Sequence, residues 1–109
     1  MQDLCGSYKM KTEGGFMLNE AAERVRKMEM YFDILQKTLN ENPQAFRDDD
    51  SVKSMLMELT QYYDGGQWLN DYRLDEMGLI PRDLKRGVLA EDSVYNLLDD
   101  IRQLEEFFQ

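Results

Sequence analysis

The sequence contains no histidine and only one cysteine, Cys5. Without histidine the chain lacks the usual general base near neutral pH, the commonest metal ligand and every Ser-His or Cys-His catalytic arrangement. A single cysteine cannot form an internal disulfide, and a structural zinc site needs several cysteine or histidine ligands. Any bound metal would therefore be a hard cation held by oxygen atoms, and proton transfer would fall to a carboxylate, a lysine or a tyrosine. We predict no cofactor.

Long apolar runs are also missing, so that no segment approaches the length that spans a bilayer. The N-terminus lacks the basic and then apolar layout of a signal peptide. These two absences predict a cytoplasmic protein with no membrane partner. A chain of 109 residues is long enough to enclose one hydrophobic core without disulfide or metal staples.

Charge is plentiful, but its sign is unevenly distributed within a net charge of −9. Residues 1–40 carry six acids and six bases, and residues 71–86 carry four of each. The excess lies in residues 41–64, with six acids and two bases, and in residues 91–109, with six acids and one base. Direct nucleic-acid binding needs clustered lysine and arginine and is therefore not expected. Acidic surfaces of this kind suit solubility or a basic partner, or an inhibitor that imitates nucleic acid through residues 48–50 and the last helix.

Apolar residues at helical spacing predict three long helices. Residues 1–16 show no sustained period and are expected to form a mobile leader, which leaves residues 17–109 as a single helical domain. The first helix should start near Leu18, with Asn19 as its N-cap, and end before Pro43. The second follows the three aspartates at 48–50, which have the wrong spacing for a calcium loop and are expected to cap the helix. The third runs from about residue 91 to residue 107.

The connection between the second and third helices is about twenty-five residues long, which is unusual for an unstructured loop. We expect it to contain one short helix over residues 67–77, closed by Gly78, and another over residues 81–87, stopped by a left-handed Gly87. The predicted fold is an all-α three-helix bundle with a long ordered connector of short helices. Its inward-facing connector residues are expected to be Trp68, Leu69, Tyr72 and Met77.

The same segment carries a family resemblance. Its distinctive residues are Tyr62-Tyr63, a glycine-containing turn, Trp68-Leu69, Asp71-Tyr72, Asp75-Glu76, Gly78, Pro81, Asp83 to Leu89, Glu91-Asp92, Val94-Tyr95 and Leu97-Leu98. This pattern resembles a family of short bacterial proteins known only as domain of unknown function 4298. The resemblance is sharpest over residues 62–98. It implies a bacterial, mainly helical protein, and it brings no assigned activity.

The function expected first is a non-enzymatic, acidic interaction or self-association module. In it the helices are a scaffold and the connector presents a shaped surface to an unknown protein partner or to a second copy. Tyrosine and tryptophan are candidates for such a surface because their rings carry a polar group and commonly anchor interfaces. The charged residues of the connector are further candidates. The interface candidates are Trp68, Tyr72, Asp75, Glu76, Lys85, Arg86 and Tyr95.

An alternative is a small carboxylate-based enzyme or a metal-binding protein that uses Asp71, Asp75 and Glu76. On a helix Asp71 and Asp75 lie four residues apart on one face, where they could share a hard cation or perturb each other's ionisation. The same acids could instead cap short helices or pair with Lys85 and Arg86 across the connector. No nucleophile stands near them in the sequence, which makes an enzyme the less favoured alternative.

Overall fold

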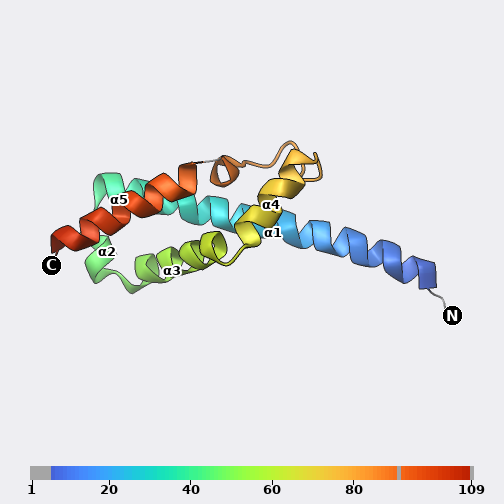
Figure 1. Ribbon diagram of the computed structural model, residues 1–109. Coiled ribbons are helices and arrows are strands. Elements are labelled where there is room, and N and C mark those ends of the chain that lie inside the picture. The colour runs from blue at the N-terminus through green and yellow to red at the C-terminus, as the bar shows by residue number, and fades with distance from the viewer. Residues whose placement is uncertain (1–5, 91, 109) are drawn as a thin grey trace.

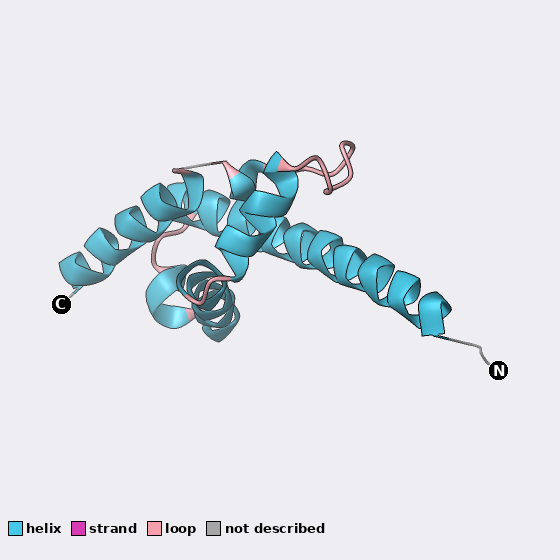
Figure 2. Ribbon diagram, turned by 45° about the vertical axis from the view of Figure 1, so that its right-hand side comes forward, coloured by secondary structure: helices cyan, strands magenta, loops and turns pink. Residues whose placement is uncertain are grey.

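The part of the chain that the structure describes is all-α, as predicted. The computed structural model describes the backbone of residues 6–90 and 92–108, with side chains from residue 20 onward, and these residues form helices and turns without a strand (Figures 1 and 2). No helix in this part of the chain is long and apolar enough to cross a bilayer. The elements in chain order are α1 (Gly6–Glu41), α2 (Ala45–Asp48), α3 (Asp50–Asp64), α4 (Gln67–Glu76), the 3₁₀ turn η1 (Gly87–Leu89) and α5 (Ser93–Phe108).

The first helix starts earlier than predicted. α1 begins at Gly6, so Asn19 lies inside the helix and is not its N-cap. Gly14 and Gly15 do not interrupt it, since a glycine inside a helix costs only about 1 kcal/mol and extending an existing helix is easy. The N-terminal part of α1 extends past all the other elements (Figures 1 and 2). Residues 6–16 of the predicted leader therefore belong to this helix, residues 1–5 lie outside the described chain, and the leader's mobility stays a prediction.

α3 begins where the aspartate run predicted. One oxygen of Asp49 accepts hydrogen bonds from the backbone N–H groups of Ser51, at 2.8 Å, and Val52, at 3.3 Å. This aspartate is therefore the N-cap, as expected for a carboxylate at a helix start. The short α2 just before it was not predicted. Its Ala45 and Phe46 are buried and form part of the hydrophobic core.

The connector between α3 and α5 agrees with the prediction in its first half only. α4 covers residues 67–76 and is closed by Gly78 in the left-handed conformation, with φ 75°. The prediction of a helix over residues 81–87 is wrong. A single turn forms at its start, where the Leu84 N–H donates to the Pro81 carbonyl, and the 3₁₀ turn η1 follows later in the chain. The Arg86 side chain bonds the Pro81 carbonyl at 2.6 Å, which holds this segment as a loop.

Gly87 allows η1 to lie close to α1, and it does not adopt the left-handed conformation that would end a helix. A Cβ at this position would lie 3.1 Å from a carboxylate oxygen of Glu29, which is tighter than ordinary contact. Among the glycines of the described chain, only Gly66 and Gly78 have positive φ. The predicted left-handed conformation of Gly87 is therefore wrong, and its missing side chain instead lets η1 approach α1.

The core lies where α1, α3 and α5 face one another. α3 runs back along α1, and α5 then runs in the same direction as α1, while α4 crosses the middle of α1 (Figure 1). η1 packs against α1, α4 and α5 and closes one end, and α2 packs against α3 and α5 at the other. The buried core cluster consists of Val25, Met28, Leu35, Ala45, Phe46, Val52, Leu59, Tyr62, Val88, Leu89, Val94, Leu97 and Ile101.

Candidate functional site

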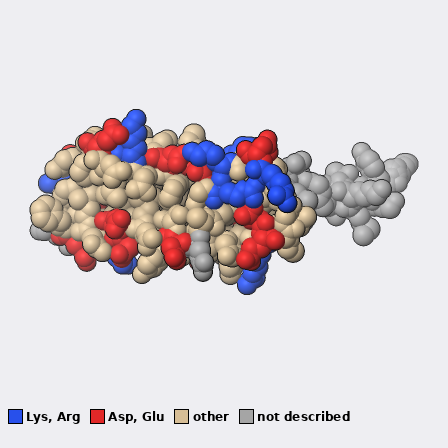
Figure 3. All heavy atoms as spheres, turned by 90° about the horizontal axis from the view of Figure 1, so that it is seen from above, with Lys and Arg blue, Asp and Glu red and all other residues tan. Residues whose placement is uncertain are grey.

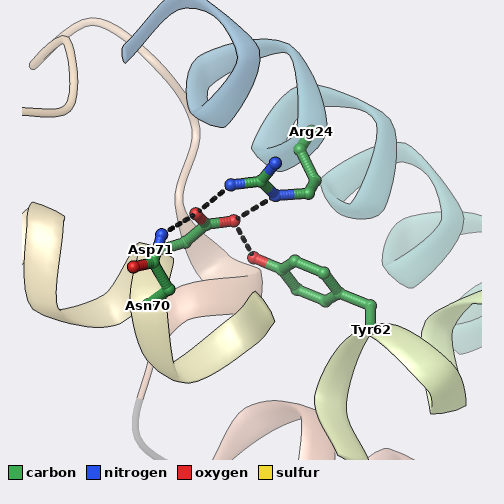
Figure 4. Close-up of polar contacts among 4 residues, drawn as sticks. All are labelled: Arg24, Tyr62, Asn70 and Asp71. Carbon is green, nitrogen blue, oxygen red and sulfur yellow. Dashed lines mark hydrogen bonds and ion pairs between the residues drawn. The ribbon is translucent and has the colours of Figure 1, made fainter. Parts of the chain in front are cut away.

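The carboxylate of Asp71, on α4, is completely buried. Arg24 of α1 donates to both of its oxygens, from Nε at 2.9 Å and from Nη2 at 2.6 Å. Tyr62 of α3 donates its hydroxyl to Oδ2 at 2.8 Å, and the side-chain amide of Asn70 lies 3.5 Å from Oδ1 (Figure 4). One carboxylate therefore joins α1, α3 and α4 through groups far apart in the sequence.

The pKa values of Arg24 and Tyr62, which both donate to Asp71, are raised for different reasons. The hydrogen bond to Asp71 raises the pKa of the Arg24 guanidinium, although partial burial opposes the shift. Burial raises the pKa of the Tyr62 hydroxyl strongly, and the neighbouring Asp71 charge raises it further. Both shifts favour a proton on the donor, so Arg24 and Tyr62 keep donating to the carboxylate at every pH near neutrality.

Two side chains bind the backbone of Val88, in η1, one at its N–H and the other at its carbonyl. Glu29 of α1, only 5 % exposed, accepts the Val88 N–H at Oε1 over 2.8 Å. The indole N–H of Trp68, on α4, donates to the Val88 carbonyl at 2.8 Å. Buried backbone groups without partners are costly, so these two side chains make a buried turn possible at this point. The end of the connector is thereby attached to α1 and α4 together.

Aromatic side chains fill the space beside this contact. The rings of Trp68 and Tyr72 are stacked, with centroids 5.1 Å apart and planes 14° apart. Tyr63 of α3 meets Trp68 in a tilted geometry at 5.2 Å. Offset stacked and tilted arrangements are the favourable ones for aromatic pairs. The connector and α3 are therefore joined by an aromatic layer as well as by hydrogen bonds.

Two ion pairs lie at the outer side of the connector. Arg86 pairs with Asp75, whose side chain is one-fifth exposed. Lys85 reaches Asp33 of α1 at 2.9 Å, but both side chains are largely exposed. An exposed pair such as that of Lys85 and Asp33 contributes little to stability. The two pairs orient the loop, whereas the buried contacts of Asp71 and Val88 hold it in place.

The structure places the predicted interface residues in three different environments. Trp68 and Tyr72 are half-buried and pack within the protein, and Asp75, Lys85 and Arg86 are paired on the connector's outer side. Glu76 is exposed beside them. Tyr95 is 54 % exposed and lies apart from the connector, on α5. The prediction that Leu69 and Met77 face inward is wrong, since they are 43 % and 63 % exposed.

The sequence did not reveal three residues that hold the connector in place. Arg24 and Tyr62 donate hydrogen bonds to Asp71, and Glu29 accepts one from the backbone of Val88. Glu29 had a usable signal, because it lies four residues after Val25 and three before Phe32, which is the spacing of the apolar seam. An acid on a buried stripe needs a partner. Nothing local indicated that this partner would be a backbone N–H in residue 88, fifty-nine positions later.

The acids considered as metal ligands do not converge. Asp71 turns inward to Arg24 and Tyr62, and Asp75 turns to Arg86. Within the described residues no three or more carboxylate or cysteine side chains are grouped in a way that could hold a metal ion. The geometry therefore supports the structural use of these acids. Binding of a hard cation here stays an untested alternative.

These features define a small all-α protein in which an ordered connector, attached to the first helix by buried polar contacts, joins two long helices. The model of a protein family described as domain of unknown function (DUF4298) matches residues 25–108. The chain therefore belongs to this family, as the resemblance over residues 62–98 predicted. Comparisons with curated proteins and with solved structures give no match.

Replacing Asp71 by Asn should destabilise the protein far more than replacing Asp75 by Asn, although both aspartates lie on α4 and both pair with an arginine. The first change leaves a partly buried guanidinium without its carboxylate and should cost about 3 kcal/mol. The second removes a pair at the surface, with side chains one-third and one-fifth exposed, and should cost less than about 1 kcal/mol. Urea unfolding followed by Trp68 fluorescence measures both. Equal losses would show that Asp71 is not the attachment point described above.

The raised pKa of Tyr62 predicts a loss of stability in alkali. Below about pH 10, the ordinary tyrosine pKa, the folded and unfolded chains both hold the proton and the stabilisation is complete. Above it the unfolded chain releases the proton first, so the free energy of unfolding falls as the pH rises. Between pH 10 and 11 the wild type should lose about 1 kcal/mol more than Tyr62→Phe. Identical losses in urea titrations at the two pH values would contradict a buried, carboxylate-bound Tyr62.

Proposed function

We propose that the protein is a non-enzymatic interaction module that associates with a second copy of itself through its connector side. The observation that carries this proposal is the exposure of apolar side chains on a connector that is otherwise held firmly. Leu69, Met77 and Leu79 are 43 %, 63 % and 45 % exposed. Exposed Leu and Met side chains that lie close together in one ordered segment are typical of a protein–protein interface.

Further apolar surface lies where the connector meets α1. A groove of about 330 Å³ there is lined by Met30 and Ile34 of α1 together with Leu84 and Lys85 of the connector. Met30 and Ile34 are 53 % and 36 % exposed. Five of the eight large hydrophobic side chains that are exposed in the described part of the chain therefore belong to α1 or to residues 69–79.

Charge supports a second copy as the occupant of this side. Residues 1–40 and 71–86 each carry equal numbers of acids and bases, so that two copies can meet here without net repulsion. Positive and negative side chains lie next to one another on the face that includes the connector (Figure 3). The acidic segments 41–64 and 91–109 would repel their equivalents, since like charges brought together cost affinity.

Substituting Met77 and Leu79 together by serine should weaken self-association by at least about tenfold, because two apolar side chains no longer leave water in the dimer. Light scattering over a concentration series measures this. The matched control is Met57→Ser, which removes an equally exposed methionine, 61 % exposed, from α3. The control should associate like the wild type.

Two results would contradict the proposal. One is a wild-type protein that stays monomeric up to about 1 mM, where even weak specific dimers form. The other is a Met57→Ser variant that loses association as much as the double variant, which would place the contact on α3. Circular dichroism of each variant verifies that the helices are retained.

A further inference from the structure

A groove of about 340 Å³ runs between α3 and α5, on a different part of the molecule from the connector surface. Its apolar lining comes from the half-buried side chains of Leu56 and Tyr63 on α3 and Leu98 on α5, all packed against the core cluster. Tyr95, 54 % exposed, stands at the α5 side of the groove. The floor is thus continuous with the hydrophobic core but open to solvent.

The separation of the two helices is built into the fold. At one end α2 packs against both α3 and α5, and Arg47 of α2 lies over the ring of Phe108 at 6.0 Å. At the other end α4 packs against α3 while η1 packs against α5, and Trp68 joins α4 to η1 through its bond to Val88. α3 and α5 are therefore held apart at both ends, and the groove between them does not depend on flexible side chains alone.

The charge around this groove is acidic. Asp64, Asp99 and Glu105 line it, against a single base among its lining residues, Arg102, which pairs with Asp99. The whole excess of negative charge, −9, comes from residues 41–64 and 91–109, the segments that supply α2, α3 and α5. A second copy of the chain offers this face either the same negative charge or the balanced charge of α1 and the connector, so a basic partner suits it better.

We propose that the groove between α3 and α5 binds an amphipathic helix of another protein, with its apolar side on Leu56, Tyr63 and Leu98 and with lysine or arginine along its edges. The lining residues of α5 extend from Tyr95 to Glu105, about 15 Å at the rise of an α-helix. That length accommodates about three turns of a bound helix. Helices recognised in grooves present apolar anchors at positions i, i+3, i+4 and i+7. Here the acidic rim adds the requirement for basic flanks.

The test uses two fluorescein-labelled peptides of about 14 residues with the same leucine face, one flanked by lysine and the other by glutamate. Binding to the full chain is followed by fluorescence anisotropy. The lysine-flanked peptide should bind, and it should bind more weakly as salt is raised, because exposed charges are screened. The glutamate-flanked peptide should bind at least about tenfold more weakly. Equal binding of the two peptides, or no binding of the lysine-flanked one, would overturn the proposal.

Protein variants locate the binding. The double variant Asp64→Asn with Glu105→Gln removes two acids from the groove, whereas Asp100→Asn with Glu106→Gln removes two exposed acids outside its lining. Both variants change the net charge equally. The first should weaken binding about fivefold and the second less than about twofold. Equal weakening by the two would show that only the overall charge attracts the peptide, and would overturn the groove assignment.

A third variant separates this surface from the self-association proposed above. Tyr95→Ser removes an exposed ring from the groove and should weaken peptide binding at least about fivefold while leaving light-scattering results unchanged. Met77→Ser with Leu79→Ser should do the reverse. If the protein does not self-associate but the lysine-flanked peptide still binds, only the dimer proposal fails. If the Met77 and Leu79 variant loses peptide binding, the peptide binds at the connector and the groove proposal is overturned.

Discussion

The buried carboxylate of Asp71 is the constraint on which the rest of the arrangement depends. A carboxylate removed from water is costly unless charged and hydrogen-bonding partners surround it. The observed placement of α4 brings Asp71 to Arg24 on α1 and to Tyr62 on α3 at the same time. With α4 placed in this way, the indole of Trp68 reaches Val88, whose N–H is in turn bound by Glu29 of α1. The connector is thus located by two acids and their donors rather than by apolar packing alone.

The sequence predicted the features that are local, and missed those that depend on distant partners. The apolar stripes located α3 and α5, and the Asp49 cap and the Gly78 stop were readable from a few neighbouring residues. The supposed helix at 81–87 had suitable local signals, but Arg86 bonds Pro81 and Asp75 instead, so tertiary contacts prevailed over capping preference. Arg24 lies 47 positions from Asp71, and Glu29 lies 59 positions from Val88, which is beyond any periodicity argument.

The fold also separates charge from exposed apolar surface. α1 and the connector have equal numbers of acids and bases and carry most of the Leu, Ile and Met side chains that are exposed among the described residues. α2, α3 and α5 carry the net negative charge, and a groove lies between α3 and α5. In the proposed function these are two surfaces with different occupants, a second copy on the neutral side and a basic helix on the acidic side. The family assignment names a domain of unknown function, so these proposals rest on the geometry and charge of this chain.

Amide hydrogen exchange across the connector measures how firmly the connector is attached to the helices. The amides of Val88 and of the last turns of α4 should exchange almost as slowly as those in the middle of α3, since each is buried or hydrogen-bonded. The exposed loop around Asp83 should exchange much faster. A Val88 amide that exchanges at the rate of an unfolded peptide would contradict the attachment of the connector to α1 and α4, because the connector would then be a flexible linker.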